Sequence, residues 1–155
     1  MKVIKAVEPF ADDIRNTFSV FLAGSIEMGK AENWQSKVER LLEDEEGVIL
    51  NPRRDDWDSS WEQVEGDNQF TRQVVWELLA QTHSDMIIMY FDPNTTSPIT
   101  LLELGLFGGM TPEKLVVCCP DGFYRKGNVD VTCKWKGIKQ VNSIEELVEE
   151  VKSRL

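Results

Sequence analysis

The strongest constraint on the fold of this chain is a set of four short apolar runs separated by segments with helical patterning. The runs are typical of buried strands and cover residues 19–23, 48–50, 86–90 and 115–119. Turn-forming pairs end two of them, at Gly24-Ser25 and Asn51-Pro52. Strands that alternate with helices predict an α/β fold, in which a parallel sheet is covered by helices on both faces.

Helical patterning occupies the intervening segments. We expect helices near residues 34–42, 69–80 and 99–107, and a C-terminal helix that begins after Ser143. Ser143 and Glu146 have the spacing of a capping box. A chain of 155 residues suits one hydrophobic core, so we predict a single domain over residues 1–155, with long loops at 51–68 and 120–128.

The charge balance excludes one class of partner. Lys and Arg number 17 and Asp and Glu number 27, which gives a formal net charge of −10. A polyphosphate backbone repels such a chain, so we expect no nucleic-acid partner. No apolar run approaches the ~20 residues that a membrane-spanning helix needs, so we expect no membrane partner. The composition is compatible with a small ligand held by a few directed groups.

Cysteine and histidine usage narrows the chemistry further. Cys118, Cys119 and Cys133 are odd in number and have neither a disulfide-framework spacing nor a CxxC pair. We interpret them as buried hydrophobic residues of a cytoplasmic protein, since the N-terminal segment also lacks a signal-peptide pattern. The single histidine, His83, excludes His-rich zinc sites and is interpreted as a solvated helix-end residue. We expect neither a metal nor another cofactor.

Three loops are predicted to meet at one edge of the sheet. In open α/β sheets the ligand lies beyond the carboxyl ends of the strands, where this chain has residues 24–26, 51–57 and 92–97. The Gly24-Ser25 pair either offers backbone N–H groups to an anion or forms a tight turn. Neither GxGxxG nor GxxxxGK[ST] occurs, so dinucleotide-type and Walker-type phosphate sites are disfavoured.

Glu103 is the most unusual residue of the predicted helices. Leu101, Leu102, Leu104 and Leu106 surround it in the sequence. If the helix buries Glu103, the pKa of its carboxyl group rises, as it does in many enzyme sites. The alternative is a carboxylate on the solvated face of an amphipathic helix.

The polar segment 51–68 combines charges with aromatic rings. Arg53-Arg54-Asp55-Asp56 is either a self-neutralising surface cluster or a source of hydrogen bonds to a planar ligand. Trp57 and Trp61 suit stacking on a nucleobase or packing against the sheet. We interpret the remaining tryptophans as core or interface residues: Trp34, Trp76 and Trp135.

Six segments in order along residues 20–133 resemble the nucleoside 2-deoxyribosyltransferase-like family. They are residues 21–26 (FLAGSI), 51–57 (NPRRDDW), 73–77 (QVVWE), 84–87 (SDMI), 98–105 (PITLLELG) and 124–130 (YRKGNVD). The resemblance implies a flavodoxin-like, doubly wound, mainly parallel sheet. It also implies a double displacement at the anomeric carbon of a 2′-deoxynucleoside, in which a base leaves and a glutamyl-sugar intermediate forms.

The resemblance also implies roles for individual residues. The Glu of the family's Glu-Leu-Gly motif is the nucleophile, and this residue is Glu103 here. The candidates by motif position for the acid that protonates the leaving base are Glu77 and Asp85, although Asp85 alternatively caps the start of a strand. The residues expected around the substrate are Gly24, Ser25, Asn51, Arg53, Asp56, Trp57, Ser97 and Asn128.

Two of these positions leave alternatives open. Ser97 stands where the transferases carry Asp, and it is similar to the Ser of a related branch, the deoxynucleoside 5′-monophosphate N-hydrolases. That branch has basic residues after Gly-Ser-Ile, whereas this chain has Glu27. Asn128 either completes the site of a neighbouring subunit, because members of the family are homo-oligomers, or serves ordinary turn chemistry.

Two readings from other classes compete with an enzyme. A non-catalytic nucleotide-binding module can use the same sheet edge, and an acidic interaction protein can dock a partner through its Trp-rich loop. A carboxylate beneath the anomeric carbon has no purpose in a module that only binds. Glu103 therefore discriminates between these readings.

Overall fold

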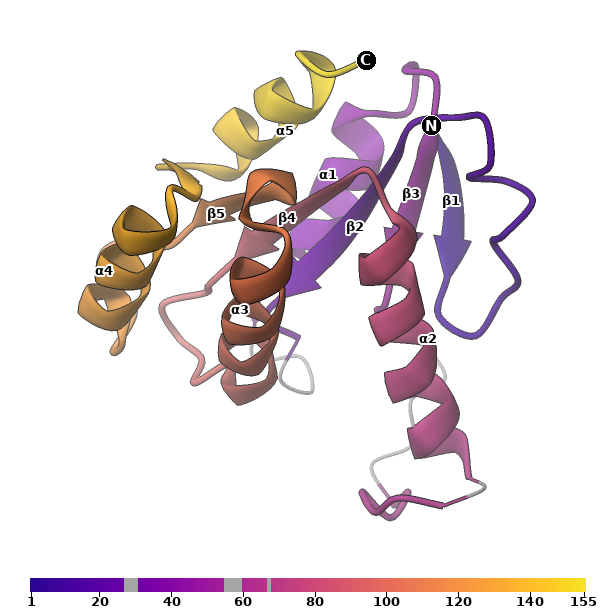
Figure 1. Cartoon of the computed structure of the whole chain (residues 1–155), viewed down its shortest axis with the longest axis horizontal. Helices are drawn as coiled ribbons and strands as arrows, with labels where there is room; N and C mark the ends of the chain where they lie inside the picture. The colour runs from indigo at the N-terminus through magenta and orange to yellow at the C-terminus, as the bar shows by residue number, and fades with distance from the viewer. Residues whose placement is uncertain (27–30, 55–59, 67) are drawn as a thin grey trace.

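The computed structural model describes residues 1–26, 31–54, 60–66 and 68–155 of the chain (Figure 1). The strands are β1 (Lys2–Lys5), β2 (Ser19–Gly24), β3 (Val48–Asn51), β4 (Met86–Tyr90), β5 (Leu115–Cys118) and β6 (Lys139–Val141). The helices are α1 (Trp34–Leu41), α2 (Gln69–His83), α3 (Pro98–Met110), α4 (Lys126–Lys136) and α5 (Ile144–Lys152), with a 3-10 turn at Pro112–Lys114.

The strands form one parallel sheet with the order β1-β3-β2-β4-β5-β6. Without β1, this order is that of the flavodoxin-like doubly wound fold, which confirms the predicted fold class. The chain moves from β2 to β3 on one side, and β4 then pairs with β2 on the other side. The topological switch point therefore lies between the carboxyl ends of β2 and β4.

Two hydrophobic layers cover the sheet. Alternate residues of β2 face opposite sides, so Phe21 belongs to one layer and Leu22 to the other. The first layer includes Trp76 of α2, Phe107 of α3 and Cys133 of α4, so these three helices share one face. The second layer includes residues of α1 and α5 (Figure 1). None of the helices in the described ranges is long and apolar enough to cross a bilayer.

Side-chain caps set the start of three helices, α1, α2 and α5, and the cap of α5 was predicted. The Asn68 side chain accepts a hydrogen bond from the backbone N–H of Thr71 at the start of α2. The Ser143 side chain accepts one from Glu146 N–H, and Glu146 Oε2 accepts one from Asn142 N–H at 2.9 Å. The reciprocal hydrogen bonds confirm the predicted capping box, with the return bond displaced by one residue.

Three elements were not predicted. β1 and β6 form the two edges of the sheet and contain too few buried residues for a strong apolar signal. α4 replaces the end of the expected 120–128 loop, because its buried stripe contains only Val129 and Cys133. Trp135 on α4 is 86% exposed, so it is not a core residue. The three cysteines are free and buried, as predicted.

We expect Gly24→Ala to lower the free energy of unfolding by about 1 to 3 kcal/mol. Gly24 has φ +158°, and a Cβ atom there would lie 2.6 Å from the Tyr90 carbonyl oxygen and 2.8 Å from the Trp34 ring. Gly109→Ala in α3 is the control, because a Cβ there meets nothing within 4 Å and alanine favours helix. Urea unfolding measures both variants. Equal stability of the two would contradict the close packing at the switch point.

Candidate active site

A cluster of buried hydroxyl groups marks the switch point. Ser25 N–H donates to the Tyr90 carbonyl at 3.1 Å, which joins the ends of β2 and β4. Ser25 Oγ accepts a hydrogen bond from Asp92 N–H at 2.9 Å and another from Thr95 Oγ1 at 2.9 Å. Ser97 Oγ contacts both Ser25 Oγ and Thr95 Oγ1. The structure thus brings together Ser25 and Ser97, two of the predicted substrate residues.

Ser97 also sets the start of α3. It has a left-handed backbone conformation, φ 43° and ψ 50°, and precedes Pro98 at the first helical position. A left-handed conformation is strained for serine, and such strain is concentrated at functional sites. Glu103 follows six residues later, in the second turn of α3.

Glu103 and Glu77 lie at the contact between α3 and α2. We call this contact the α2–α3 seam and define it by Gln73, Glu77 and Gln81 of α2 and Glu103 of α3. Gln81 Nε2 donates to Glu103 Oε1 at 2.6 Å, and Gln73 Nε2 donates to Glu77 Oε1 at 2.6 Å. Helical side chains tilt toward the N-terminus of their helix, so both carboxyl groups tilt toward the carboxyl edge of the sheet.

Burial makes both carboxyl groups of the seam weak acids. The pKa of Glu103 is raised to about 8, mainly by burial and also by the negative charge of Glu77, while the hydrogen bond from Gln81 acts in the opposite direction. Burial raises the pKa of Glu77 to about 7 against the hydrogen bond from Gln73. Between these pKa values the coupled pair holds about one proton. One carboxylate and one carboxylic acid side by side can serve as nucleophile and general acid.

The sequence analysis did not name Gln73 or Gln81 as candidate site residues. They are buried polar residues of α2, at 5% and 0% exposure. Gln73, Glu77 and Gln81 recur every four residues, which places them on one stripe of the helix. This polar stripe was a detectable signal, because four-residue spacing toward a sheet is usually apolar.

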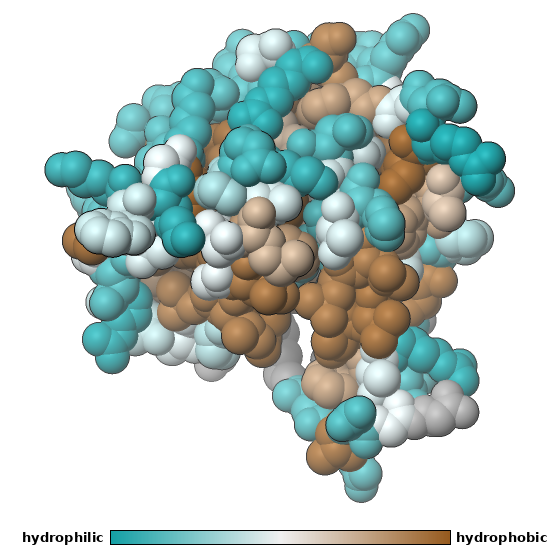
Figure 2. Space-filling model, in the orientation of Figure 1, coloured by the Kyte–Doolittle hydropathy of each residue, from teal (hydrophilic) through white to brown (hydrophobic). Residues whose placement is uncertain are grey.

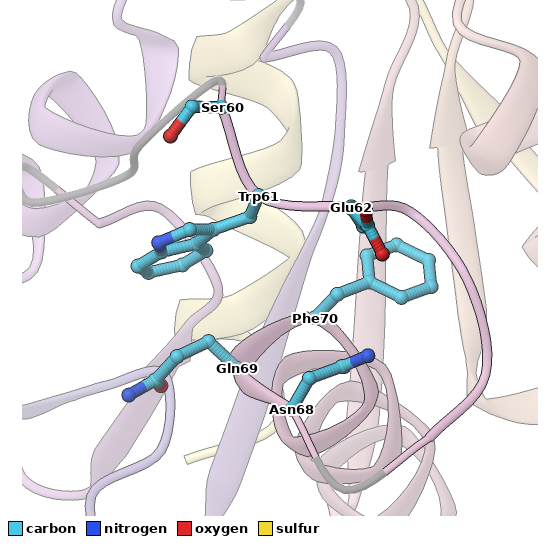
Figure 3. A pocket seen from close by; sticks show the side chains of 6 residues that line it. All are labelled: Ser60, Trp61, Glu62, Asn68, Gln69 and Phe70. Atoms are coloured by element: carbon cyan, nitrogen blue, oxygen red, sulfur yellow. The ribbon is translucent and has the colours of Figure 1, made fainter.

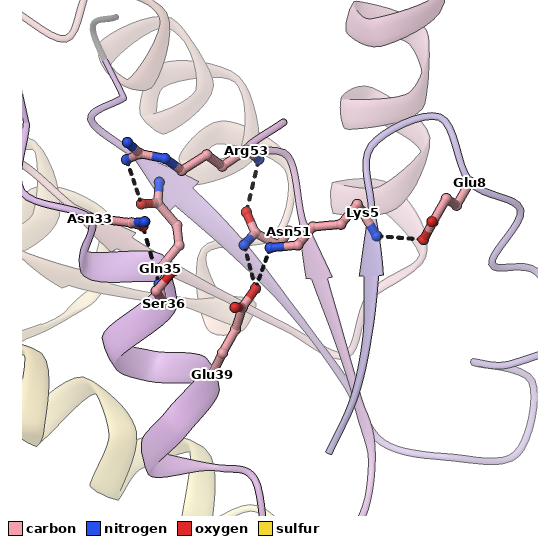
Figure 4. A network of polar contacts seen from close by, with 8 residues as sticks. All are labelled: Lys5, Glu8, Asn33, Gln35, Ser36, Glu39, Asn51 and Arg53. Carbon is pink, nitrogen blue, oxygen red and sulfur yellow. Dashed lines mark hydrogen bonds and ion pairs between the residues drawn. The ribbon is translucent and has the colours of Figure 1, made fainter. Parts of the chain in front are cut away.

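Asn51 and Arg53 lie together at the carboxyl end of β3 (Figure 4). Asn51 is fully buried; its Nδ2 donates to Glu39 Oε1 at 2.6 Å and its Oδ1 accepts from Arg53 N–H at 2.8 Å. Lys5 Nζ also donates to Glu39 Oε1, at 2.6 Å. Arg53 Nη1 donates to Gln35 Oε1 at 3.4 Å. The Asn51 side chain therefore holds the start of the following loop, and the half-buried Arg53 extends toward α1.

A pocket of about 430 Å³ lies at the first turn of α2 (Figure 3). It is lined by Ser60, Trp61, Glu62, Asn68, Gln69 and Phe70. The Arg54 guanidinium lies 5.2 Å from the centre of the Trp61 ring, a cation–π distance. Gln69 precedes Glu77 by eight residues, which corresponds to about 12 Å along the helix. The predicted Asp56 and Trp57 lie outside the described residues.

The structure corrects one predicted catalytic residue. Asp85 immediately precedes β4, at the amino ends of the strands, whereas Ser25 and Ser97 lie at the carboxyl ends. Asp85 Oδ2 accepts hydrogen bonds from Ser19 N–H and Ser19 Oγ, both at 2.9 Å. The carboxylate thus ties the starts of β2 and β4 together. This geometry assigns Asp85 the alternative role of capping a strand.

The remaining predicted residues are peripheral within one chain. Asn128 is exposed in the first turn of α4 and, among the described residues, forms no hydrogen bond with Glu77 or Glu103. His83 is the exposed last residue of α2, as expected of a solvated helix end. Across the described ranges no three His, Cys, Asp or Glu side chains cluster in a way that suits a metal ion.

We expect Glu103→Gln to stabilise the protein increasingly as pH rises. The pKa of Glu103 is about 8 in the folded state against an ordinary value of 4.5 for glutamate, so unfolding releases a proton at pH values between the two. Stability of the wild type is therefore lost as pH rises from about 4.5 to 8. Glutamine does not titrate, so the advantage of the variant should reach roughly 2 to 4 kcal/mol above pH 8.

Urea unfolding at several pH values measures this difference. Glu113→Gln, at an exposed position just after α3, controls for the loss of one negative charge. A difference between wild type and Glu103→Gln that is constant from pH 5 to pH 9 would show that Glu103 is not a buried acid.

Comparison with known proteins places the chain in a family. A comparison with curated proteins finds no match. The sequence model of the family described as nucleoside 2-deoxyribosyltransferase like matches residues 17–123. The matched range runs from β2 through β5 and includes the hydroxyl cluster, the pocket and the α2–α3 seam. The chain therefore belongs to the nucleoside 2-deoxyribosyltransferase-like family.

Proposed function

We propose that this protein, acting as one domain, cleaves or exchanges the N-glycosidic bond of 2′-deoxynucleosides through a covalent intermediate on Glu103. The observation that carries the proposal is the pair of partly buried carboxyl groups with raised pKa values, Glu103 and Glu77, at the α2–α3 seam. Membership in the family supports the same reaction. A module that only binds has no need for two adjacent acids with raised pKa values.

The two carboxyl groups have different roles in the first step of the proposed reaction. The Glu103 carboxylate attacks C1′ of the sugar, and the C1′–N bond breaks with its electron pair going to the base. Because the pKa of Glu103 is the higher of the two, the shared proton lies mainly on Glu103 in the free protein, and it passes to Glu77 when the substrate binds. Glu77 then supplies this proton to the leaving base. A second base or water then attacks C1′, gives its proton to Glu77 and releases Glu103. An acceptor base yields a new nucleoside, and water yields free deoxyribose. This route uses no metal or other cofactor.

Apolar side chains border the nucleophile. Ile99 and Leu106 lie one turn before and one turn after Glu103 on α3, and they are 60% and 42% exposed. A sugar bound against them displaces water from the seam, which protects the covalent intermediate from premature hydrolysis in a transferase. In this proposal Gly24, Ser25 and Ser97 surround the sugar, while Arg53 faces the base.

A second candidate substrate is the 5′-monophosphate of the same nucleosides. The feature that favours it is the hydroxyl cluster of Ser25, Thr95 and Ser97, which offers neutral groups at the carboxyl edge. A phosphate accepts hydrogen bonds from hydroxyls and is not repelled by them. The reaction at C1′ would be the same.

We also propose that copies of the chain assemble through α2 and α3. Seven large apolar side chains on these helices are at least 40% exposed: Val75, Leu78, Leu79, Ile99, Leu102, Leu106 and Met110. Figure 2 shows hydrophobic residues gathered where Figure 1 places the two helices. A patch of this size usually marks an interface. Within an oligomer, Asn128 of a neighbouring copy reaches the 5′ end of the sugar.

We expect base release from 2′-deoxynucleosides by the wild type, and a loss of several orders of magnitude in kcat for Glu103→Gln. The amide keeps the shape of the side chain but is not a nucleophile. The assay incubates each protein with a panel of deoxynucleosides and their 5′-monophosphates, with and without an acceptor base, and measures released or exchanged base. Addition of EDTA should leave the rates unchanged.

Glu113→Gln is the matched control and should keep wild-type kcat, because Glu113 lies outside the seam. Circular dichroism checks that Glu103→Gln is folded. Wild-type turnover in Glu103→Gln would refute the covalent mechanism. Turnover of monophosphates alone would select the second candidate substrate.

We expect Leu102→Glu to dissociate the oligomer, because Leu102 is 66% exposed at the centre of the apolar face and a charge cannot be buried there without a partner. Val64→Glu, at a 53% exposed position outside the helices, is the control. Light scattering coupled to size-exclusion chromatography measures the mass of each protein. A monomeric wild type would contradict the proposed assembly.

A further inference from the structure

The amide of Gln81 connects the two helices of the seam. Its Nε2 donates to Glu103 Oε1 at 2.6 Å, and it also lies 3.4 Å from the Glu77 backbone carbonyl oxygen within α2. The side chain is fully buried. Among the described residues, Gln81 is the only hydrogen-bond partner of the Glu103 carboxyl group. The two contacts together fix both the place and the orientation of the amide.

This orientation leaves the amide oxygen without a partner. Gln81 Oε1 is buried and accepts no hydrogen bond from the described residues. An unsatisfied buried acceptor costs about 1 to 3 kcal/mol. A rotated amide would place Gln81 Oε1 against Glu103, an arrangement that suits the protonated acid but brings two acceptors together when Glu103 is ionised. The observed orientation therefore provides a donor for ionised Glu103 and leaves the amide oxygen of Gln81 without a hydrogen bond.

We propose that Gln81 is a positioning residue for the nucleophile: it holds Oε1 of Glu103 and leaves the other carboxylate oxygen to attack C1′ of the sugar. The proposal rests on the proposed function for the identity of the attacked atom. The hydrogen bond restricts rotation of the carboxylate, and a carboxylate with one oxygen held presents the other in a defined direction.

Gln81 also affects the charge of Glu103. Glu103 is the only titratable residue of α3, and the titratable side chains of α2 are Arg72, Glu77 and His83. Of these, Glu77 acts on Glu103 and raises its pKa, as burial does. The Gln81 hydrogen bond lowers the pKa of Glu103 and so opposes both effects. Without this donor, a smaller share of Glu103 is ionised near neutral pH.

The test replaces the donor and follows Glu103 directly. Gln81→Met keeps the approximate shape without a polar group, and Gln81→Glu exchanges the amide for a third carboxyl group. Carbon-13 NMR of glutamate carboxyl groups, with the Glu103 signal assigned through Glu103→Gln, reports the titration without substrate. We expect the midpoint of Glu103 to rise by about one pH unit in Gln81→Met, as loss of a charge-assisted hydrogen bond implies, and further in Gln81→Glu.

Gln73→Met is the matched control, because Gln73 donates in the same way to Glu77 Oε1. It should move the midpoint of Glu77 more than that of Glu103. On the active substrate, the acidic limb of the kcat profile of Gln81→Met should shift to higher pH by the same interval, and KM should change little. If Gln81 served only for packing, its replacement would lower the stability of the protein without shifting the pH profile of kcat.

The outcomes separate this inference from the proposed function. If both Gln81 variants keep the wild-type titration midpoint of Glu103, the positioning role of Gln81 is wrong, even if the wild type is active. Shifted midpoints with no wild-type activity on any substrate would support the link between Gln81 and Glu103 and refute the proposed reaction. If Gln81→Met does not fold, Gln81→Glu carries the same measurement.

Discussion

The burial of two carboxyl groups without a cation is the interaction on which the site depends. Hydrogen bonds to Glu103 and Glu77 come from glutamines, and no Lys or Arg among the described residues forms an ion pair with either. An arginine in place of Gln81 would stabilise the ionised form and lower the pKa of Glu103. The proton available near neutral pH would then be lost. Neutral donors orient the carboxyl groups and leave one proton on the pair.

The topology of the sheet brings these groups together. The connection from β3 to β4 and the connection from β4 to β5 both cross the same face, so α2 and α3 become neighbours. Both helices begin at the carboxyl edge of the sheet, because each follows the end of a parallel strand. The left-handed backbone of Ser97 then starts α3 within contact of the hydroxyl cluster. Glu103, the proposed nucleophile, is thereby separated from the switch point by less than two helical turns.

The sequence predicted the central strands and the capping box of the C-terminal helix, because each has a local signal, and it singled out Glu103 as a carboxylate among leucines. The apolar pattern of α2 does not mark its buried face. Phe70, Val74 and Leu78 have apolar four-residue spacing, yet Leu78 is 40% exposed, and the buried residues of α2 are Gln73, Trp76, Ala80 and Gln81. The stripe of α2 that faces the seam is polar, because its glutamines hold the carboxyl groups. The apolar stripe of α2 lies partly exposed to solvent. The role of Asp85 likewise depends on the direction of β4, because the strand direction decides whether a residue lies at the amino or the carboxyl edge of the sheet.

For the proposed reaction, the charges at the switch point argue for an uncharged nucleoside rather than its monophosphate. Asp92 is 3% exposed and adjoins the hydroxyl cluster through its own N–H, which donates to Ser25 Oγ. Its carboxylate accepts hydrogen bonds from Glu32 N–H and from both N–H groups of Asn94, which fix it at this edge. A phosphate at about 4 Å from such a carboxylate would be repelled by about 4 kcal/mol per unit charge at an effective dielectric constant near 20. The formal net charge of −10 adds repulsion at longer range. Asp92 and the negative net charge therefore oppose the monophosphate, although the hydroxyl cluster itself would accept either substrate.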